Sequence, residues 1–541
     1  MDSLTRTFNY LATTENEASV SLLMAALDHR DRAVADGALE ALLRRQSTEA
    51  CAELIRRWHL LNDRWKQITA ERPGVLAPEL KVAFHSSDEQ LIRNAADAAV
   101  ATADYELSAM FALAAADRLP LRRRLAGETL LRLAELLYDE LHGLARGRVR
   151  HDPQCIRDFM VGNLESPVTK YHEHHSREIL EAFLLLAPRE CATMRHLLHD
   201  AQESSHQPLC DQLLRSTRPG VIRLLLSLLD DPRAPLAPLR IMGRRRDVGF
   251  FRQLCKKLVD DRSPHLDANL ARLDSLAWLD DQELSLIESL SEAEQPGLVH
   301  LVVGARLPAQ EKLRVLKQLL AQGAPLGRHA AAKAMFSLFG KKFDWLVLDL
   351  IGDPCPLVQA EAARHLRVCD VPDAVATLLK LLDSPHVEVQ VAARESLEEF
   401  SLVRYLHTFD SLTEHARITT GQLVKRVNPQ VADELQIELI APGRARRLRA
   451  LQVVDVLDVA PQVMSALCEL CNDDTQPVRL AAARLLGQCT SPDVVLAASQ
   501  QLRELLADEN NAVQHAAEQA LQLLAPRLPQ HSGLQLAEAL K

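Results

Sequence analysis

Histidine and acidic residues suited to metal chemistry gather in one short segment, Tyr171 to His175 (YHEHH), with Glu178 close behind. Imidazole and carboxylate groups are common ligands of zinc. On a helix, His172 and His175 would share a face, as would His174 and Glu178. This spacing would allow a metal site, but a solvated face near a helix start is the simpler interpretation. We therefore assign no metal site to the cluster.

A Cys-x-x-Cys pattern, Cys468 and Cys471, is the next candidate for metal or redox chemistry. It lies in an apolar segment, has no second pair at zinc-ribbon spacing, and has only Cys489 nearby. We interpret these cysteines as core residues. A Gly-rich phosphate loop and a Gly-x-Ser-x-Gly nucleophile elbow are both absent from the sequence. We therefore predict no catalytic residue, no cofactor and no enzymatic activity.

Arginine clusters are the remaining candidates for binding, because guanidinium groups pair readily with carboxylates and phosphates. They could bind an acidic peptide, a phosphate group or a nucleic-acid backbone, or they could pair with acids of neighbouring helices. We favour the structural pairing, and the scarcity of aromatic residues argues against a platform for stacking bases. Two clusters are the candidate partner-binding residues: Arg244, Arg245 and Arg246, and Arg444, Arg446 and Arg447.

Composition and charge limit the class of protein. The chain of 541 residues has a formal charge of −10 and is 4% aromatic, unlike a general nucleic-acid binder that must neutralise many phosphates. No apolar run is long enough to cross a membrane and no signal peptide is recognisable, so we expect no membrane insertion. The 10 cysteines are scattered, as in proteins of a reducing compartment, so we expect a cytoplasmic location.

The elements that would position these residues belong to a repeat. Its clearest copy has an acidic turn, then Pro477, then Val478, Ala482 and Leu486 at offsets of four and eight. Three copies with the same pattern contain Val358, Ala362 and Leu366; Val389, Ala393 and Leu397; and Val513, Ala517 and Leu521. Weaker copies contain Val34, Ala38 and Leu42; Ile92, Ala96 and Val100; Leu326, Ala330 and Ala334; and Arg446, Ala450 and Val454.

Each feature of the repeat has a physical role. Offsets of four and eight place the three residues on one helical face, and the alanine lets the next helix approach closely. The turn aspartate accepts backbone N–H groups at the helix start, and proline fits the first turn. Two short helices cannot bury their apolar faces alone, so neighbouring repeats must stack. The sequence therefore predicts an all-α fold, a right-handed α-solenoid of stacked antiparallel helix pairs with no β-sheet.

Residues 325–400 and 446–524 resemble HEAT repeats, especially the short bacterial HEAT-like form that is also found in phycobilin lyases. The resemblance implies a fold and no single activity. HEAT-like repeats also occur in di-iron deoxyhypusine hydroxylases, whose pattern uses several His-Glu pairs. Among the 20 histidines here only His172 precedes a glutamate in such a pair, which argues against that activity.

The repeat pattern is clear in some parts of the chain and weak in others, and this difference predicts five segments. Degenerate HEAT-like repeats occupy residues 1–130, and an irregular helical middle region follows at 131–320. Regular repeats occupy 321–400 and 446–541, joined by an irregular helical connection at 401–445. The two irregular segments are where we expect a bend or a partner site.

These observations favour a non-enzymatic scaffold or adaptor that binds a protein partner on an extended solenoid surface. Nucleic-acid binding through the arginine clusters is an alternative, since HEAT-like solenoids also occur in alkylpurine DNA glycosylases. A further alternative is a lyase or assembly factor similar to the phycobilin lyases, and it rests on the resemblance alone.

The alignment of the repeats makes a prediction about stability. Replacing Ala393 or Ala482 by leucine puts a larger side chain where two helices approach closely. We therefore expect the free energy of unfolding to fall by roughly 1–3 kcal/mol. Thermal unfolding of the two variants beside the unchanged chain measures the effect, and unchanged stability of both would show that the alignment is wrong.

Overall fold

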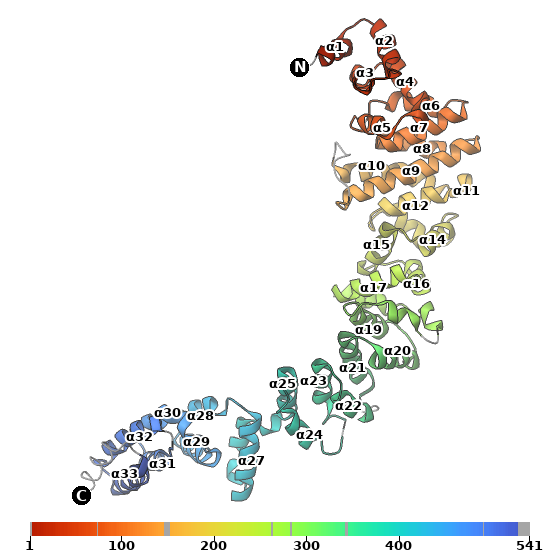
Figure 1. Cartoon of the computed structure of the whole chain (residues 1–541). Helices are drawn as coiled ribbons and strands as arrows, with labels where there is room; N and C mark the ends of the chain where they lie inside the picture. Colours follow the sequence, from red (N-terminus) through yellow and green to blue (C-terminus); the bar gives the residue numbers. More distant parts are fainter. Residues whose placement is uncertain are drawn as a thin grey trace. The chain divides into compact units, whose positions relative to one another are not determined.

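The structure of the chain is a computed structural model (Figure 1). Most of the chain is α-helical, and the helices form where apolar residues recur three or four positions apart. The structure describes residues 3–72, 74–144, 152–260, 263–281, 284–340, 344–369, 371–490 and 492–527. No β-strand occurs in these ranges, so the predicted all-α array of stacked helix pairs is confirmed. The helices form two units, residues 1–331 and 332–541. The finer division into five segments stays a prediction.

The helices of the first unit pack in two rows, and Figure 1 shows α7, α9 and α12 lying one after another in the first row. This first row contains α1 (Ser3–Thr13), α3 (Arg32–Arg45), α5 (Asp63–Ala70), α7 (Glu89–Ala101), α9 (Pro120–Leu141), α12 (Arg177–Leu186), α15 (Pro219–Ser227), α17 (Val248–Asp260) and α19 (Gln295–Gly304). The second row contains α2 (Ala18–Leu27), α4 (Thr48–Arg56), α6 (Ala77–Phe84), α8 (Ser108–Ala114), α10 (Pro153–Thr169), α13 (Ala192–His199) and α16 (Leu236–Arg244).

Shorter or terminal elements complete the first unit. They are α11 (Tyr171–His174), α14 (His206–Arg215), α18 (Pro264–Leu270), α20 (Ala309–Gln322) and α21 (Pro325–Phe339), within which the first unit ends. Its 3-10 turns are η1 (Trp58–Leu60), η2 (Tyr105–Leu107), η3 (Leu228–Asp230), η4 (Ala277–Asp280) and η5 (Ser285–Ser289).

Buried asparagines and a glycine allow close packing in the first unit. The side-chain amide of Asn94 in α7 donates to two carbonyl oxygens at the end of α4, at 2.9 and 2.8 Å. Asn269 in α18 does the same at the end of η3, at 2.9 Å to each oxygen. A Cβ on Gly297 of α19 would lie 1.8 Å from the carbonyl oxygen of Cys255 in α17, so only glycine permits this approach. These positions set helix spacing in addition to the buried repeat alanines of α3 and α7, Ala38 and Ala96.

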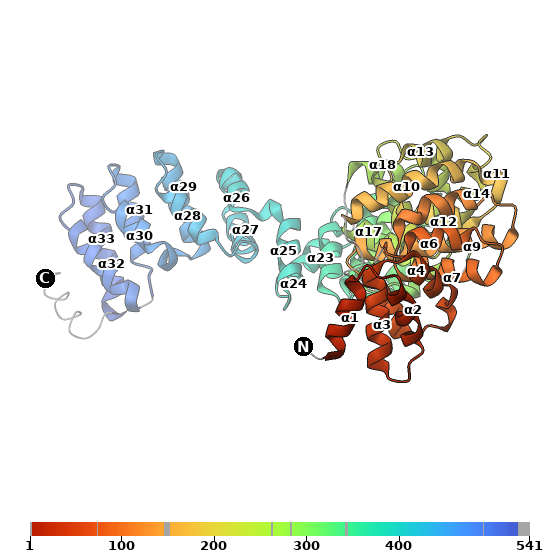
Figure 2. The same ribbon diagram turned by 90° about the horizontal axis from the view of Figure 1, so that it is seen from above.

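The second unit is a succession of helix pairs, and Figure 2 shows α28 to α33 following one another in order. Its helices are α22 (Asp344–Ile351), α23 (Pro356–His365), α24 (Ala374–Leu381), α25 (Val387–Ser396), α26 (Leu402–Thr408), α27 (Glu414–Val427), α28 (Val431–Leu439), α29 (Arg444–Leu457), α30 (Met464–Leu470), α31 (Gln476–Leu486), α32 (Pro492–Leu505) and α33 (Asn511–Leu524). Its 3-10 turns are η7 (Glu398–Phe400), η8 (Phe409–Ser411), η9 (Ala460–Val463) and η10 (Ala525–Arg527).

The predicted repeat alanines of the second unit lie in helix contacts. Ala362, Ala393, Ala482 and Ala517 are each fully buried, in α23, α25, α31 and α33. Within the second unit α23 packs on α25, α29 packs on α31, and α31 packs on α33. A residue without a long side chain at these positions is what permits the close stacking.

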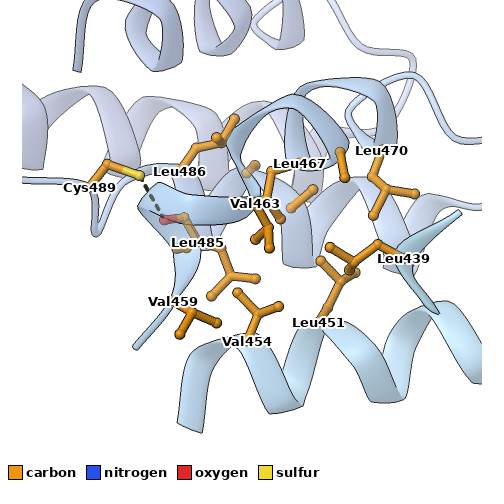
Figure 3. Packing of buried hydrophobic residues seen from close by; sticks show 14 of the residues in the cluster. Leu439, Leu451, Val454, Val459, Val463, Leu467, Leu470, Leu485, Leu486 and Cys489 are labelled. Atoms are coloured by element: carbon orange, nitrogen blue, oxygen red, sulfur yellow. Dashed lines mark hydrogen bonds between the residues drawn. The ribbon is translucent and has the colours of Figure 1, made fainter. Parts of the chain in front are cut away.

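A continuous buried cluster runs from Leu402 to Leu524. Figure 3 shows its centre, where Val454 of α29 lies among side chains from α30 and α31. The thiol of Cys489 lies 3.9 Å from the carbonyl oxygen of Leu485. Cys471 is also buried in this cluster, and burial raises the pKa of its thiol to about 12, so the thiol is protonated at neutral pH. The Cys-x-x-Cys pattern thus lies at a packed core.

The turns contain a hydrogen bond that the sequence pattern does not predict. In the four clear copies of the repeat, the residue directly after the first apolar position donates from its side chain to the carbonyl oxygen six residues earlier. Arg447, which follows Arg446 in the weaker copy of α29, does the same. We call this bond the repeat clip. It joins Gln359 to Asp353 (2.7 Å), Gln390 to Ser384 (2.7 Å), Arg447 to Ala441 (3.1 Å), Arg479 to Asp473 (2.8 Å) and Gln514 to Asp508 (2.6 Å).

In the regular repeats the turn aspartates bind a backbone N–H just before the helix begins, and not one in the first helical turn as predicted. The carboxylates of Asp353, Asp473 and Asp508 each accept the backbone N–H two residues later, at 2.7 to 2.8 Å, and that residue is still outside the helix. In two weaker copies the prediction is correct, because Asp31 and Asp88 are themselves the capping residues of α3 and α7.

Two of the clip residues also join one repeat to the next. A guanidinium nitrogen of Arg447 lies 2.8 Å from a carboxylate oxygen of Asp473, and one of Arg479 lies 2.7 Å from Asp508. All four side chains are largely buried. The hydrogen bond from Arg479 lowers the pKa of the Asp508 carboxyl below its ordinary value. Folding therefore favours the charged form of Asp508.

Asp508→Asn tests this link between repeats. We expect the variant to lose about 1.5–3 kcal/mol of unfolding free energy at neutral pH, the range for hydrogen bonds to charged groups. The pKa of the Asp508 carboxyl is lower in the folded chain than in the unfolded chain, where it is about 3.9. The stabilisation is therefore present above about pH 3.9 and is lost as the pH falls through the pKa of Asp508 in the folded chain.

Denaturant unfolding of the variant and of the unchanged chain between pH 7 and pH 3 measures the difference. Glu509→Gln removes the same charge from the neighbouring exposed residue and is the control. Equal effects of the two substitutions, or a difference that is the same at every pH, would contradict the role of the Asp508 carboxylate.

Candidate functional site

The first predicted arginine cluster is split by the end of α16. Arg245 is buried, and its guanidinium donates to the carbonyl oxygens of Leu213 and Ser216 at 2.7 and 2.8 Å and to the Asp247 carboxylate at 2.8 Å. Arg246 pairs with an aspartate of η4. Only Arg244 is exposed and without an ion pair among the described residues. The three consecutive arginines therefore do not form one surface.

The second predicted cluster is also divided, within the second unit. Arg447 forms the repeat clip and the link to Asp473 described above. Arg446 pairs with Glu438 through two nitrogen–oxygen contacts of 2.6 and 2.8 Å. Arg444 is exposed at the start of α29 and has no ion pair in the described part of the chain. Structural pairing thus occupies Arg245, Arg446 and Arg447.

Arg244 lines a surface cleft of the first unit between α13, α14 and α16, which we call the α14–α16 cleft. Its volume is about 400 Å³. Arg240 lines it as well, one helical turn before Arg244, and His199 and His206 lie on the opposite elements. Arg240 and Arg244 are both exposed, and neither has an ion pair among the described residues.

The position of α16 explains why these two arginines face the cleft. Pro235 precedes the first helical residue and Pro238 lies in the first turn, where a missing N–H is tolerated. Leu239 and Met242 are buried, so residues 240 and 244, four apart, share the opposite, exposed face. The helix therefore presents two guanidinium groups side by side.

The other polar groups of the cleft leave this positive charge largely uncompensated. Asp211 is the one acidic residue of the lining, and its carboxylate accepts a hydrogen bond from a neighbouring glutamine at 2.9 Å. Cys210 lies 3.6 Å from Nε2 of His206, but burial raises the pKa of the thiol to about 11. A protonated thiol is a poor nucleophile, so we assign no catalytic role to the Cys210–His206 contact.

A larger cleft of about 590 Å³ lies on the first row, among α7, α9, α12 and α15. Its charges are mostly neutralised within the chain. Arg132 lies 3.1 Å from Asp97, and Arg218 lies 3.0 Å from Glu181 and pairs with Glu135. A partner that used Arg132 or Arg218 would have to break these pairs, so this cleft is less suited than the α14–α16 cleft to capturing an acidic segment.

The histidine cluster does not form the shared helical faces considered from the sequence. Helix α11 ends at His174, and His175 has a left-handed backbone with φ of 54°. His174 is buried, and its two ring nitrogens lie 2.9 Å from the Pro167 carbonyl oxygen and the Ser176 N–H nitrogen. Burial lowers the pKa of His174. This ring fixes a turn and has no nitrogen left for a metal.

The sequence matches known repeat families over part of its length. Residues 343–427 match the family model for HEAT repeats, and residues 463–491 match the model for a single HEAT repeat. The resemblance of these segments of the second unit to HEAT repeats is thus confirmed, whereas the closer similarity to the phycobilin-lyase form stays a prediction. A search of curated protein sequences found no match.

Solved structures match most of the chain at low sequence identity. A chain from a structure of the cadherin–β-catenin interaction is 16% identical, with 94% of this chain and 99% of that chain covered and a TM-score of 0.31. Kap121p is 14% identical, with 97% of this chain covered and a TM-score of 0.25, and the match spans 53% of Kap121p. An engineered protein is 16% identical, with 93% and 98% covered and a TM-score of 0.18. The likeness supports no functional argument.

A helix that crosses a membrane must be both long and apolar. None of the helices in the described ranges is both long enough and apolar enough to cross a membrane.

Arg244 and Arg245 are neighbours with opposite roles, which a pair of substitutions can test. Arg245→Ala removes a buried cation and leaves two carbonyl groups and a carboxylate without their donor. We expect it to lower the unfolding free energy by about 3 kcal/mol or more. Arg244→Ala removes an exposed side chain, so the expected change is within about 0.5 kcal/mol. Thermal and urea unfolding measure both variants, and similar stability of the two would contradict this assignment.

Proposed function

We propose that the chain is a non-enzymatic scaffold that binds an acidic segment of a protein partner in the α14–α16 cleft. The observation that supports the proposal is the pair of exposed arginines, Arg240 and Arg244, on one face of α16. Guanidinium groups one helical turn apart can each form a bidentate pair with a carboxylate. Successive turns of an acidic segment supply carboxylates at comparable spacing.

A protein partner suits this cleft better than a nucleic acid. Nucleic-acid binding requires many cations along an extended path, whereas the chain has a net charge of −10. The arginines proposed from the sequence are mostly neutralised, since Arg246, Arg446 and Arg447 pair with acidic side chains. Two unpaired arginines in a cleft of about 400 Å³ match a short peptide segment rather than a phosphate backbone.

The non-enzymatic part of the proposal follows from the chemistry of the clefts. We assign no nucleophile among the described residues that line the two clefts: burial raises the pKa of the Cys210 thiol, and Asp97 and Glu135 of the larger cleft are paired with arginines. A lyase or assembly factor similar to the phycobilin lyases therefore has no residue here to which we assign its chemistry. We also propose a cytoplasmic location, because all 10 cysteines are free thiols.

A capture experiment with matched variants tests the proposal. The tagged full chain, the variant Arg240→Glu/Arg244→Glu and the control Arg484→Glu/Arg503→Glu are used on native lysate at 50 and 300 mM salt. The control changes the charge equally at two exposed arginines of α31 and α32 that have no ion pair among the described residues. Bound protein is identified by mass spectrometry and bound nucleic acid is quantified.

The proposal predicts one defined protein that the unchanged chain and the control retain and that the Arg240→Glu/Arg244→Glu variant loses by at least tenfold. A peptide from the acidic part of that protein should compete for the cleft. Equal retention by all three chains would show that the cleft is not the binding site. Nucleic acid retained at low salt alone would replace the scaffold by the nucleic-acid alternative.

A further inference from the structure

Three potential metal ligands meet where α13 ends. His196 lies in the last turn of α13, Asp200 is the residue that follows the helix, and Glu203 lies in the loop before α14. One ligand atom from each side chain lies within 4.8 Å of the other two. Nε2 of His196 is 3.2 Å from Oε1 of Glu203. The histidine and the aspartate are four positions apart, so they project from the same side of the helix end.

Backbone hydrogen bonds hold the loop in this conformation. The N–H of Glu203 donates to the carbonyl oxygen of Asp200 at 3.3 Å, and the N–H of His206 donates to that of Glu203 at 3.0 Å. Oδ1 of Asp200 accepts the N–H of Gln202 at 2.9 Å. Oδ2 of Asp200 has no hydrogen bond among the described residues. The three side chains are therefore brought together by the fold of the loop, and one carboxylate oxygen is left for another partner.

The donor set suits a divalent cation. One imidazole nitrogen and two carboxylate oxygens are ligands that zinc accepts, at about 2.0–2.2 Å. Two ligand atoms at that distance in tetrahedral geometry are roughly 3.4 Å apart, which is close to the 3.2 Å between His196 and Glu203. Three protein ligands leave a fourth position for water. A cation would also relieve the repulsion between the carboxylates of Asp200 and Glu203.

We propose that His196, Asp200 and Glu203 form a divalent-metal site with a preference for zinc-like ions. The site does not depend on the partner-binding proposal, because none of the three ligands lines the α14–α16 cleft. The side chains are partly exposed, with His196 59% and Glu203 36% accessible, so an ion can enter without opening the fold. Exposure also makes binding reversible.

Calorimetric titration of the untagged full chain with Zn²⁺ tests this site, after treatment with a chelator. The titration uses a Cys155→Ser background, because Cys155 is the exposed thiol among the 10 cysteines and would compete for zinc. We expect one Zn²⁺ per chain, and His196→Ala and Glu203→Gln are each expected to weaken binding at least tenfold. Co²⁺, added in place of zinc, gives a visible spectrum that reports nitrogen and oxygen ligands independently of the heat signal.

A matched control comes from α33. Nδ1 of His515 lies 3.5 Å from an oxygen of Glu518, so this exposed pair resembles the proposed site but has no third ligand among the residues that the structure describes. His515→Ala is therefore expected to bind zinc as tightly as the parent chain. The proposal is overturned if the parent shows no saturable binding, or if His196→Ala binds zinc as tightly as the parent. Thermal unfolding of the metal-free variants confirms that each is folded.

Discussion

A pair of short helices cannot bury its apolar face without a neighbour, and every other feature of this protein depends on that constraint. In the second unit the alanines at Ala393 and Ala482 let adjacent helices approach, and a continuous core from Leu402 to Leu524 results. In the first unit the repeat alanines Ala38 and Ala96 are buried as well, and other residues add to them. Buried amides such as Asn94, and the glycine at Gly297, set the helix spacing there. The stacking is common to both units, while the residues that achieve it differ in part.

This difference explains how much of the fold could be predicted. Apolar residues at offsets of four and eight identified α23, α25, α31 and α33. An alanine between two larger apolar residues at this spacing indicates a close contact between two helices, and these alanines are buried. The repeat clip could not be recognised, since Gln359 or Arg479 looks like an ordinary surface residue until its carbonyl acceptor is placed six residues back. Much of the first unit was harder to predict, because outside recognised copies such as α3 and α7 its close contacts, such as that of Gly297, leave no periodic pattern.

The candidate site was predicted in part, for a reason of helical geometry. Consecutive arginines look like a charged patch in the sequence, but neighbours on a helix end point in different directions. Arg245 is consequently buried, while Arg244 shares its face with Arg240, which stands outside the cluster. The spacing of four between them was the available signal. The ligands at His196 and Glu203 come together through a turn, which no helical periodicity describes.

The repeat clip has a consequence for how such a chain can change in length. Where the clip residue is glutamine, as at Gln359 and Gln390, its bond stays within its own repeat. Where it is arginine, as at Arg447 and Arg479, the same side chain also neutralises an aspartate of the next repeat. Deleting a glutamine repeat breaks only exposed or half-exposed ion pairs such as Arg364–Glu395, whereas excising an arginine repeat leaves a buried carboxylate without its partner. Gain and loss of repeats is therefore least costly around residues 353–400.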